Sequence, residues 1–506
     1  LVALVFVVAL MVGYYRFAGF IASCAVLFNI LIMWGVLQNL DAALTLPGIA
    51  AIVLTIGMAV DANVLVFERF REEFKISGRL ASALQAGYRK AFTAIVDSNV
   101  TTIIAAVILL QFDSGPIKGF AITLIIGILS SMFTSLFMTR YFFAGWVQNA
   151  KHKTLTMSEW IHDTKFDFIG KTRIALMVSG IVIFCGAYLL AEQRNSIFGM
   201  DFTGGYSLTL DLKEKPAMES SYRIAASQAL INDGASPNDV DVRELSRPNQ
   251  LRIQLGIGME QNGHPFYRLP DTTANNGDLP YAYQTNPRMA WVINALQKAG
   301  LEVPESQLTQ LEKNWTVMSG QLSDSMRNNA LFGLGLAMLS ILLYITLRFE
   351  FKYAISAVIG LAHDVIITLG ILALFHKLGF PVQINLEVIG AIMTIIGYSL
   401  NDTIIVFDRI REDLKLHRKM PFSALVNHSL NVTLGRTLMT SGTTIVVLLA
   451  LVVLGGEAIF SFSLVMTIGV VVGTLSSLFI ATPILLYFHN REERKDKEHR
   501  LSTRRA

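Results

Sequence analysis

Long apolar segments separated by short polar ones fill most of the 506-residue chain, and this pattern predicts a membrane protein. A helix that crosses a membrane needs about 20 mainly apolar residues. Eleven segments approach or exceed that length: 1–15, 18–37, 47–67, 92–112, 116–143, 174–190, 330–347, 353–375, 386–407, 434–454 and 459–488. The first is short and begins without a Met or a charged leader, so we expect a helix that is cut at its start. The fold class is therefore a polytopic α-helical membrane protein of about 11 spans.

Residues 191–328 follow a different pattern, rich in Asn, Gln and Asp and without a run long enough to cross a membrane. Periodicity predicts a strand, a helix, two strands, a helix and a last strand. These are 206–212, 217–232, 240–245, 251–255, 288–298 and 315–322, with a Gly-, Asn- and Pro-rich loop or insertion at 258–286. Their order favours one small α+β domain of the ferredoxin-like class.

The chain thus divides into a membrane bundle, an exposed linker, one span, the polar domain, a second bundle and a charged tail. The bounds, in that order, are 1–147, 148–173, 174–190, 191–328, 329–488 and 489–506. Basic residues collect after residues 67 and 407, and basic loops stay on the cytoplasmic side of a membrane. This rule places the linker and the tail in the cytoplasm and predicts that 191–328 is extracytoplasmic.

Composition and charge exclude several function classes. The chain is 53% hydrophobic and 16% charged, and its net charge of +4 lies in short clusters that set orientation. No basic face with interleaved aromatic residues is present in the sequence, so we expect no nucleic-acid binding. Cys24 and Cys185 both lie in apolar runs, and we infer no disulfide framework.

The sequence also offers no other energy source than the membrane. Gly170, Lys171 and Thr172 match the end of a phosphate-binding P-loop, but Lys165 stands where its first glycine belongs. No cluster has metal-ligand spacing, and no nucleophile is paired with a base. We therefore expect a protein that is not an enzyme, holds no metal and uses no cofactor other than protons.

One motif occurs twice. The sequence GMAVDANVLVFERFREE begins at Gly57, and GYSLNDTIIVFDRIRED begins 340 positions later at Gly397. Both copies leave an apolar segment in the same direction, which predicts two parallel, pseudo-symmetric helical bundles with sites at the interface between them. Each copy carries a carboxylate within the apolar segment, and such costly residues are functional candidates by default.

The two copies are similar but not equivalent. Asp61 aligns with Asn401, whereas Asp402 aligns with Ala62, a shift of one residue or about 100° around a helix. Offsets of 335 and 342 set Asn29 opposite Asp364 and pair Thr101 and Thr102 with Thr443 and Thr444. The second offset places Arg436 opposite Ala94, so that only the second half has this charge.

These charges suggest a proton relay. Asp402 and Arg436 lie at similar depths in successive spans and could pair. Burial favours the neutral acid and a guanidinium favours the carboxylate, so moving the arginine would change proton affinity. A static ion pair is the alternative. Asp61 has no basic partner in its own half, which favours an acid that titrates or contacts water.

His363 and Asp364, in AHDVIITLG, could shuttle protons or join two helices by a hydrogen bond. Asp97 and Asn99 favour a role in joining helices over one in the relay. The polar residues expected to support the relay are Asn29, Asn63, Asp97, Asn99, Thr101, Thr102, Asn401, Thr443 and Thr444.

These motifs resemble a known family. GMAVDANVLVFERFREE with DSNVTT resembles the C-terminal membrane part of SecD, and FGMDFTGGY, AHDVIITLG, GYSLNDTIIVFDRIRED and NVTLGRTLMTSGTT resemble SecF. The likeness covers nearly the whole chain, with the junction at 148–163. The chain is similar to a SecDF-type fusion truncated before the second span of its SecD part, in the RND superfamily.

The resemblance implies an accessory subunit of the Sec translocase in the bacterial cytoplasmic (inner) membrane, which uses the proton-motive force to help export preproteins. It implies that Asp61, Asp402 and Arg436 match the family's membrane charges. The implied partners are the SecYEG translocon, SecA, YajC, YidC, unfolded preprotein and membrane lipids. Substrate capture is ascribed to the large exported domain of SecD, which this sequence lacks.

Two other functions remain open. Efflux of small molecules or lipids shares this architecture but requires deep apolar pockets in large exported domains, which the single polar domain fits poorly. A passive assembly scaffold for the translocon is the other, and it predicts that Asp402→Asn retains export assistance.

Overall fold

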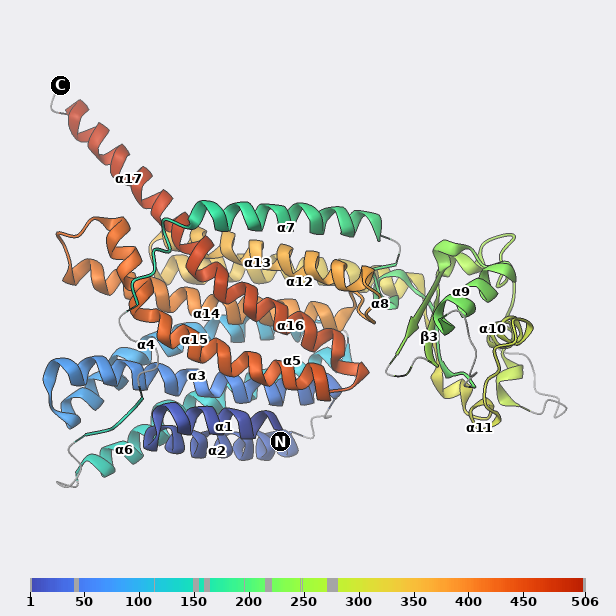
Figure 1. Cartoon of the computed structure of the whole chain (residues 1–506), viewed down its shortest axis with the longest axis horizontal. Coiled ribbons are helices and arrows are strands. Elements are labelled where there is room, and N and C mark those ends of the chain that lie inside the picture. Colours follow the sequence, from blue (N-terminus) through green and yellow to red (C-terminus); the bar gives the residue numbers. More distant parts are fainter. Residues whose placement is uncertain are drawn as a thin grey trace. The chain divides into compact units, whose positions relative to one another are not determined.

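The structure, a computed structural model, describes residues 2–40, 45–112, 114–148, 154–158, 164–194, 196–213, 221–245, 247, 249–270 and 281–503. The chain forms two compact units (Figure 1). We call them the helical unit, which comprises Leu1–Gly186, Gly333–Ile371 and Gly390–Ala506, and the sheet unit, which comprises Ala187–Phe332 and Leu372–Ile389.

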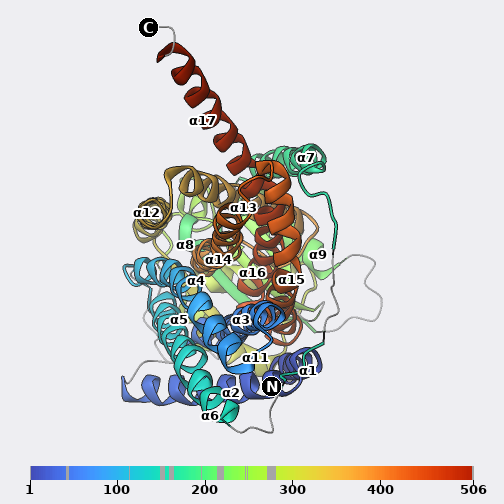
Figure 2. The same cartoon turned by 90° about the vertical axis from the view of Figure 1, so that its left-hand side faces the viewer.

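Long helices make up most of the helical unit, and Figure 2 shows many of them nearly end-on. Four of them contribute end residues to the sheet unit, namely 187–192, 320–332, 372–377 and 386–389. In the first part of the chain they are α1 (Val2–Tyr15), α2 (Phe17–Asn39), α3 (Leu46–Ser77), α4 (Leu80–Leu109), α5 (Gly115–Phe133), the π-helix η1 (Thr134–Met138), α6 (Thr139–Val147) and α7 (Thr172–Glu192). In the second part they are α12 (Gly320–Arg348), α13 (Phe351–Lys377), α14 (Leu386–Leu416), α15 (Phe422–Leu454), α16 (Glu457–Ser476), the π-helix η6 (Ser477–Ala481) and α17 (Thr482–Thr503). By length and composition, ten helices of the described chain can cross a membrane, and α1 is a shorter apolar helix.

Local sequence sets the ends of these helices. Helix α3 begins after Thr45, whose hydroxyl accepts a hydrogen bond from the Gly48 amide at 3.1 Å, and Pro47 occupies its first turn. It ends at Gly78, which has a φ of 61° and closes the helix in the left-handed conformation. Helices α3 and α14 both continue past the apolar segments that predicted them, into the charged part of the repeated motif.

The repeat appears in the backbone as well as in the sequence. The π-helical turns η1 and η6 interrupt the last span of each half and begin at Thr134 and Ser477, which are 343 positions apart. A π-turn inserts one extra residue into a helix and is rare. Its presence at the same place in both halves supports the predicted pseudo-symmetry.

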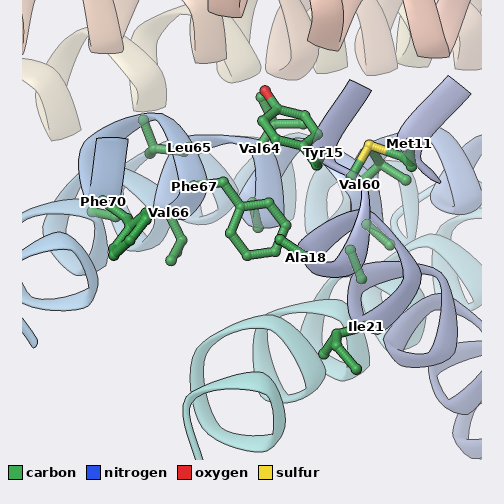
Figure 3. Close-up of a cluster of buried hydrophobic side chains, with 14 of the residues drawn as sticks. Met11, Tyr15, Ala18, Ile21, Val60, Val64, Leu65, Val66, Phe67 and Phe70 are labelled. Carbon is green, nitrogen blue, oxygen red and sulfur yellow. The ribbon is translucent and has the colours of Figure 1, made fainter. Parts of the chain in front are cut away.

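A cluster of buried apolar side chains joins the α1–α2 hairpin to α3 (Figure 3). Tyr15 and Phe67 are both buried, and their ring centroids lie 5.4 Å apart. The hairpin turns at Arg16, which has a φ of 52°, and α2 then passes so close to α1 that a Cβ on Gly19 would lie 2.0 Å from the Met11 carbonyl oxygen. The predicted hairpin is therefore present and requires this glycine.

The linker is exposed over most of its described residues, as expected, but it is anchored at a few points. Leu155 and Phe168 are buried. The backbone amides of Phe166 and Phe168 each donate to an asparagine side chain of α15, Asn431 and Asn427, at 2.8 Å. Two apolar side chains and two backbone amides of the linker thus find partners within the helical unit, which its polar composition did not indicate. Residues 149–153 and 159–163 lie outside the described chain.

The sheet unit contains a four-stranded antiparallel sheet in the order β2-β3-β1-β4. Its larger elements are β1 (Gly205–Asp211), α9 (Tyr222–Asn232), β2 (Val240–Glu244), β3 (Gln250–Leu255), α10 (Pro287–Lys298) and β4 (Trp315–Met318). The predicted order of strands and helices is observed, and the ferredoxin-like class stays a prediction. Strand β4 is shorter than predicted because α12 begins at Gly320, where Ser319 accepts a hydrogen bond from the Leu322 amide.

The FGMDFTGGY motif connects the sheet to residues 384–386. The Gly199 amide donates to the Ile384 carbonyl at 2.8 Å, and the Leu386 amide donates to the Asp201 carboxylate at 2.9 Å. Asp201 thereby caps the first turn of α14. Burial raises the pKa of Asp201 above its usual range, and the hydrogen bond from Leu386 opposes that rise.

The predicted loop at 258–286 contributes to the core of the sheet unit. Of its residues, 271–280 lie outside the described chain. In the rest, the side chains of Met259, Phe266 and Tyr283 are buried in the apolar cluster that β1, β3 and α10 also line. The segment is therefore more than a surface insertion, because its apolar side chains fill space between the sheet and its helices.

Candidate functional site between the two halves

The repeated motif forms a close seam between the halves of the helical unit. A Cβ added to Gly57 on α3 would lie 3.3 Å from the Thr444 Cα on α15, and one added to Gly397 on α14 would lie 2.8 Å from the Thr102 Cα on α4. Each glycine thus faces the repeat-equivalent threonine of the opposite half. The same contact is made twice, as a two-fold arrangement requires.

This geometry gives a graded prediction. Gly397→Ala is expected to destabilise the protein by about 1–3 kcal/mol, because the new methyl group meets backbone that cannot rotate away. Gly57→Ala, with more room, should cost less. Gly390→Ala on the same helix is the matched control, since a Cβ there meets nothing within 4 Å. Thermal unfolding in detergent measures the three, and equal stability of Gly397→Ala and Gly390→Ala would contradict the seam.

Asp61 and Arg436 form a buried ion pair across the seam. Arg436 Nη2 lies 3.2 Å from Asp61 Oδ1, and the two residues are 5% and 6% exposed. The side-chain amide of Asn401 donates to the other oxygen of Asp61. Both of these partners of the first-half acid therefore come from the second half.

The sequence left open whether Arg436 pairs with Asp402, and in this structure it pairs with Asp61 instead. Among the described residues, the ion pair of Arg436 is with Asp61 and none joins it to Asp402. The reason is the two-fold packing, which sets α15 against α3 of the other half, as the Gly57–Thr444 contact shows. Asp402 is 4% exposed and accepts a hydrogen bond from Ser441 at 3.1 Å. Ser441 accepts in turn from Thr474 at 2.8 Å.

A small cavity adjoins the ion pair. Asp61, Asn99, Asn401 and Arg436 help to line it, and it offers about 10 Å³ to the centre of a water molecule, which is close to the least that holds one water. Two donors of Arg436, Nε and Nη1, and the Asn401 carbonyl oxygen are buried without a protein partner in the described chain. A single water fits here beside a carboxylate, donors and an acceptor.

His363 and Asp364 belong to a separate network. His363 Nδ1 lies 3.0 Å from Asp364 Oδ1, and His363 Nε2 lies 2.5 Å from the Ser179 hydroxyl on α7. Ser399 on α14 and Ser476 on α16 donate to Asp364 Oδ2 at 2.6 and 2.8 Å. Four helices therefore meet at this pair, which favours the helix-joining interpretation over the shuttle. The repeat counterpart Asn29 bonds Ser130 in the first half.

Asp97 also joins helices, as its sequence position favoured. It accepts from Arg348 Nε at 2.6 Å and from the Tyr344 hydroxyl at 3.1 Å, both on α12. The other expected supporting residues bond mainly the carbonyls of their own helices: Asn63, Asn99, Thr101, Thr102, Thr443 and Thr444. Thr444 also accepts from the Tyr398 hydroxyl at 2.9 Å.

Sequence reasoning missed one cluster of charges. Arg69 and Glu72 on α3 and Arg409 and Glu412 on α14 form what we call the charge ring. Arg69 lies 2.8 Å from Glu412, and Arg409 lies 2.9 Å from Glu72. The sequence held the signal, because both arginines and both glutamates are 340 positions apart. The positive charges of the two arginines had been assigned only to membrane orientation.

The fold and the site define the class of the chain as a multi-pass membrane protein of two matched halves that share a buried ion pair. The family model described as protein export membrane protein SecD/SecF, C-terminal, matches residues 1–149 and 302–491. The chain belongs to the SecD/SecF family and is of the SecDF type, in which both parts form one chain.

Two relatives and one solved structure show the extent of the likeness. The protein translocase subunit SecDF of Brucella abortus is 32% identical over 489 residues, 94% of this chain and 58% of the relative, and that of Bacillus subtilis is 30% identical over 521 residues, 98% and 64%. The crystal structure of SecDF from Thermus thermophilus, described as translocon-associated, has a TM-score of 0.81 at 30% identity and covers 97% of this chain and 61% of that one. The chain thus spans about three fifths of the length of these relatives.

Proposed function

We propose that the chain is an accessory part of the Sec protein translocase that uses the proton-motive force to promote export of preproteins across the bacterial cytoplasmic membrane. The observation that supports this most is the Asp61–Arg436 pair, an acid and a base contributed by opposite halves at one seam. The described association of the Thermus relative with a translocon also supports it. Residues 191–328 would then lie outside the membrane, and SecYEG, SecA, YajC and YidC would be partners.

The proposed mechanism follows from charge. Ionised Asp61 holds Arg436 and Asn401, and so holds α3 against α15 and α14. A proton on Asp61 removes the attraction for Arg436 while burial still penalises the guanidinium, so the halves must rearrange to give Arg436 another partner. We assign Asp402, which is buried and lies one residue after Asn401, as the carboxylate that then pairs with Arg436. A movement between the halves would be transmitted to the sheet unit through the polypeptide segments that connect the two units.

The energy available is sufficient. At a membrane potential on the order of 150 mV, one charge that crosses the whole field releases about 3.5 kcal/mol. That free energy shifts a two-state equilibrium by more than about a hundredfold. One proton per cycle can therefore move the halves between two arrangements.

Asp402→Asn tests the proposal against its two alternatives. The chain is reconstituted with a Sec translocon in proteoliposomes, and preprotein translocation is measured with and without an imposed proton-motive force. We expect Asp402→Asn to lose the stimulation while its level and its association with the translocon stay unchanged; Glu350→Gln, an exposed change, is the control. Retained stimulation would favour a passive scaffold. Altered drug susceptibility of cells with normal secretion would favour efflux.

A further inference from the structure

The charge ring closes on itself through four ion pairs. Arg69 lies 2.8 Å from Glu412 and 3.1 Å from Glu72, while Arg409 lies 2.9 Å from Glu72 and 3.7 Å from Glu412. Each arginine therefore contacts both glutamates, and the charges alternate around the ring. Two of its members come from each half.

The ring surrounds the pseudo-two-fold axis of the helical unit. Arg69 and Arg409 are repeat equivalents, and so are Glu72 and Glu412, so each cross-half pair is the image of the other. Asp61 and Asn401 are also equivalents, and they contact each other directly. A residue can touch its own equivalent only near the axis. The ring and the Asp61–Asn401 contact thus lie along the same line between α3 and α14.

The spacing of these residues along the helices ties the ring to one register of α3 against α14. Arg69 follows Asp61 by eight residues, which is about 12 Å along α3. A slip of one residue between α3 and α14 would turn the side chains by about 100° and break both cross-half pairs. The arrangement that closes the ring is therefore the one that sets Asp61 against Asn401.

Burial and neighbouring charges strengthen the ring. The side chains of Arg69 and Arg409 are only 8% and 13% exposed, so salt screens them little. Further charges support each side. They are Asp408 at 3.8 Å from Arg69, Asp413 at 3.2 Å from Arg409, and Lys90 at 3.1 Å from Glu412. Neutralising one member leaves a half-buried partner short of countercharge.

We propose that Arg69, Glu72, Arg409 and Glu412 are positioning residues for proton transfer: their ring fixes the register of α3 against α14 and so holds Asp61 within reach of Asn401 and Arg436. The inference rests on the proposed function and deepens it. None of the four touches the proton that is transferred. They act through the helices that carry the acid.

Proton transport by the full chain tests the inference. The chain is reconstituted in proteoliposomes, and proton flux under an imposed potential is measured as a function of pH. The variants are Arg69→Gln, Glu412→Gln and their double, then the mirror set at Arg409 and Glu72. Lys352→Gln with Glu492→Gln is the control, since that ion pair (3.0 Å) joins α13 and α17 instead of α3 and α14.

We expect each ring variant to lower the flux about tenfold and to move the pH midpoint of the remaining flux by about half a unit, since the donors to Asp61 are displaced. The Arg69→Gln/Glu412→Gln double variant should have a flux no lower than that of its more impaired single variant. The variants at Arg409 and Glu72 should show the same effects. A purely structural role predicts less folded protein with an unchanged midpoint, which overturns the inference. If a single variant fails to fold, the double variant is used for the same test, because it removes both charges of the Arg69–Glu412 pair. Absence of flux in the unaltered chain would overturn the proposed function itself, whereas flux insensitive to the ring would overturn only the ring.

Discussion

Asp61→Asn is expected to abolish proton-driven activity and to destabilise the observed arrangement of the helical unit by about 3–5 kcal/mol, because in this arrangement it leaves Arg436 buried without its countercharge. Arg436 is 5% exposed, and two of its nitrogens already lack protein partners in the described chain. Removing the remaining carboxylate contact therefore exposes the full cost of burying a guanidinium. Thermal unfolding in detergent and proton-stimulated translocation measure the two effects.

A second variant separates the two effects. Asp61→Asn combined with Arg436→Gln removes both charges, so most of the lost stability should return while proton-driven activity stays absent. If Asp61→Asn were as stable and active as the unaltered chain, the ion pair would be neither buried nor functional. If the double variant regained activity, the pair would serve only as a structural link.

Phe266→Ala is expected to destabilise the sheet unit by about 3–5 kcal/mol, which is the usual cost of emptying the space of a buried aromatic side chain. Phe266 is fully buried, and its ring packs edge-on against Tyr206 and Trp291 at centroid distances of 5.2 and 5.5 Å. The segment that carries it would then be needed for the fold of the sheet unit. Hydrogen exchange at the amides of β1 and β3 reports the loss.

The neighbouring residue supplies the control. Tyr267 is 39% exposed, and the Arg268 guanidinium lies 5.1 Å from its ring centroid, so Tyr267→Ala should cost less than about 1 kcal/mol. Protection in β1 and β3 that survives Phe266→Ala would show that 258–270 is a dispensable insertion. Equal losses in both variants would show that the effect comes from the loop backbone.

Much of the fold follows from the sequence because two strong patterns specify it. Apolar length predicts the spans, and the 340-residue offset predicts two matched halves, which η1 and η6 also display. Alternation predicts the strands well, because Leu251, Ile253 and Leu255 point into the core on alternate positions of β3. The buried role of Phe266 could not be predicted, since it is an isolated apolar residue in a Gly- and Asn-rich segment.

The residues of the candidate site could be predicted from the sequence, but their contacts could not. Offsets identify equivalent residues, such as Asp61 and Asn401, but they do not say which helices face each other. The sequence allowed Arg436 to pair within its own half with Asp402, whereas the two-fold packing gives it Asp61 of the other half. The charge ring was overlooked for a related reason: Arg69 and Arg409 have an obvious role in membrane orientation, which hid their contacts across the seam.

The proposed mechanism depends on an acid that gains and loses a proton between two matched halves. Infrared difference spectra of the reconstituted chain, taken between acid and alkaline pH, test this most directly. We expect a carboxyl band that appears on acidification and that Asp61→Asn removes. A spectrum that Asp61→Asn leaves unchanged would contradict it.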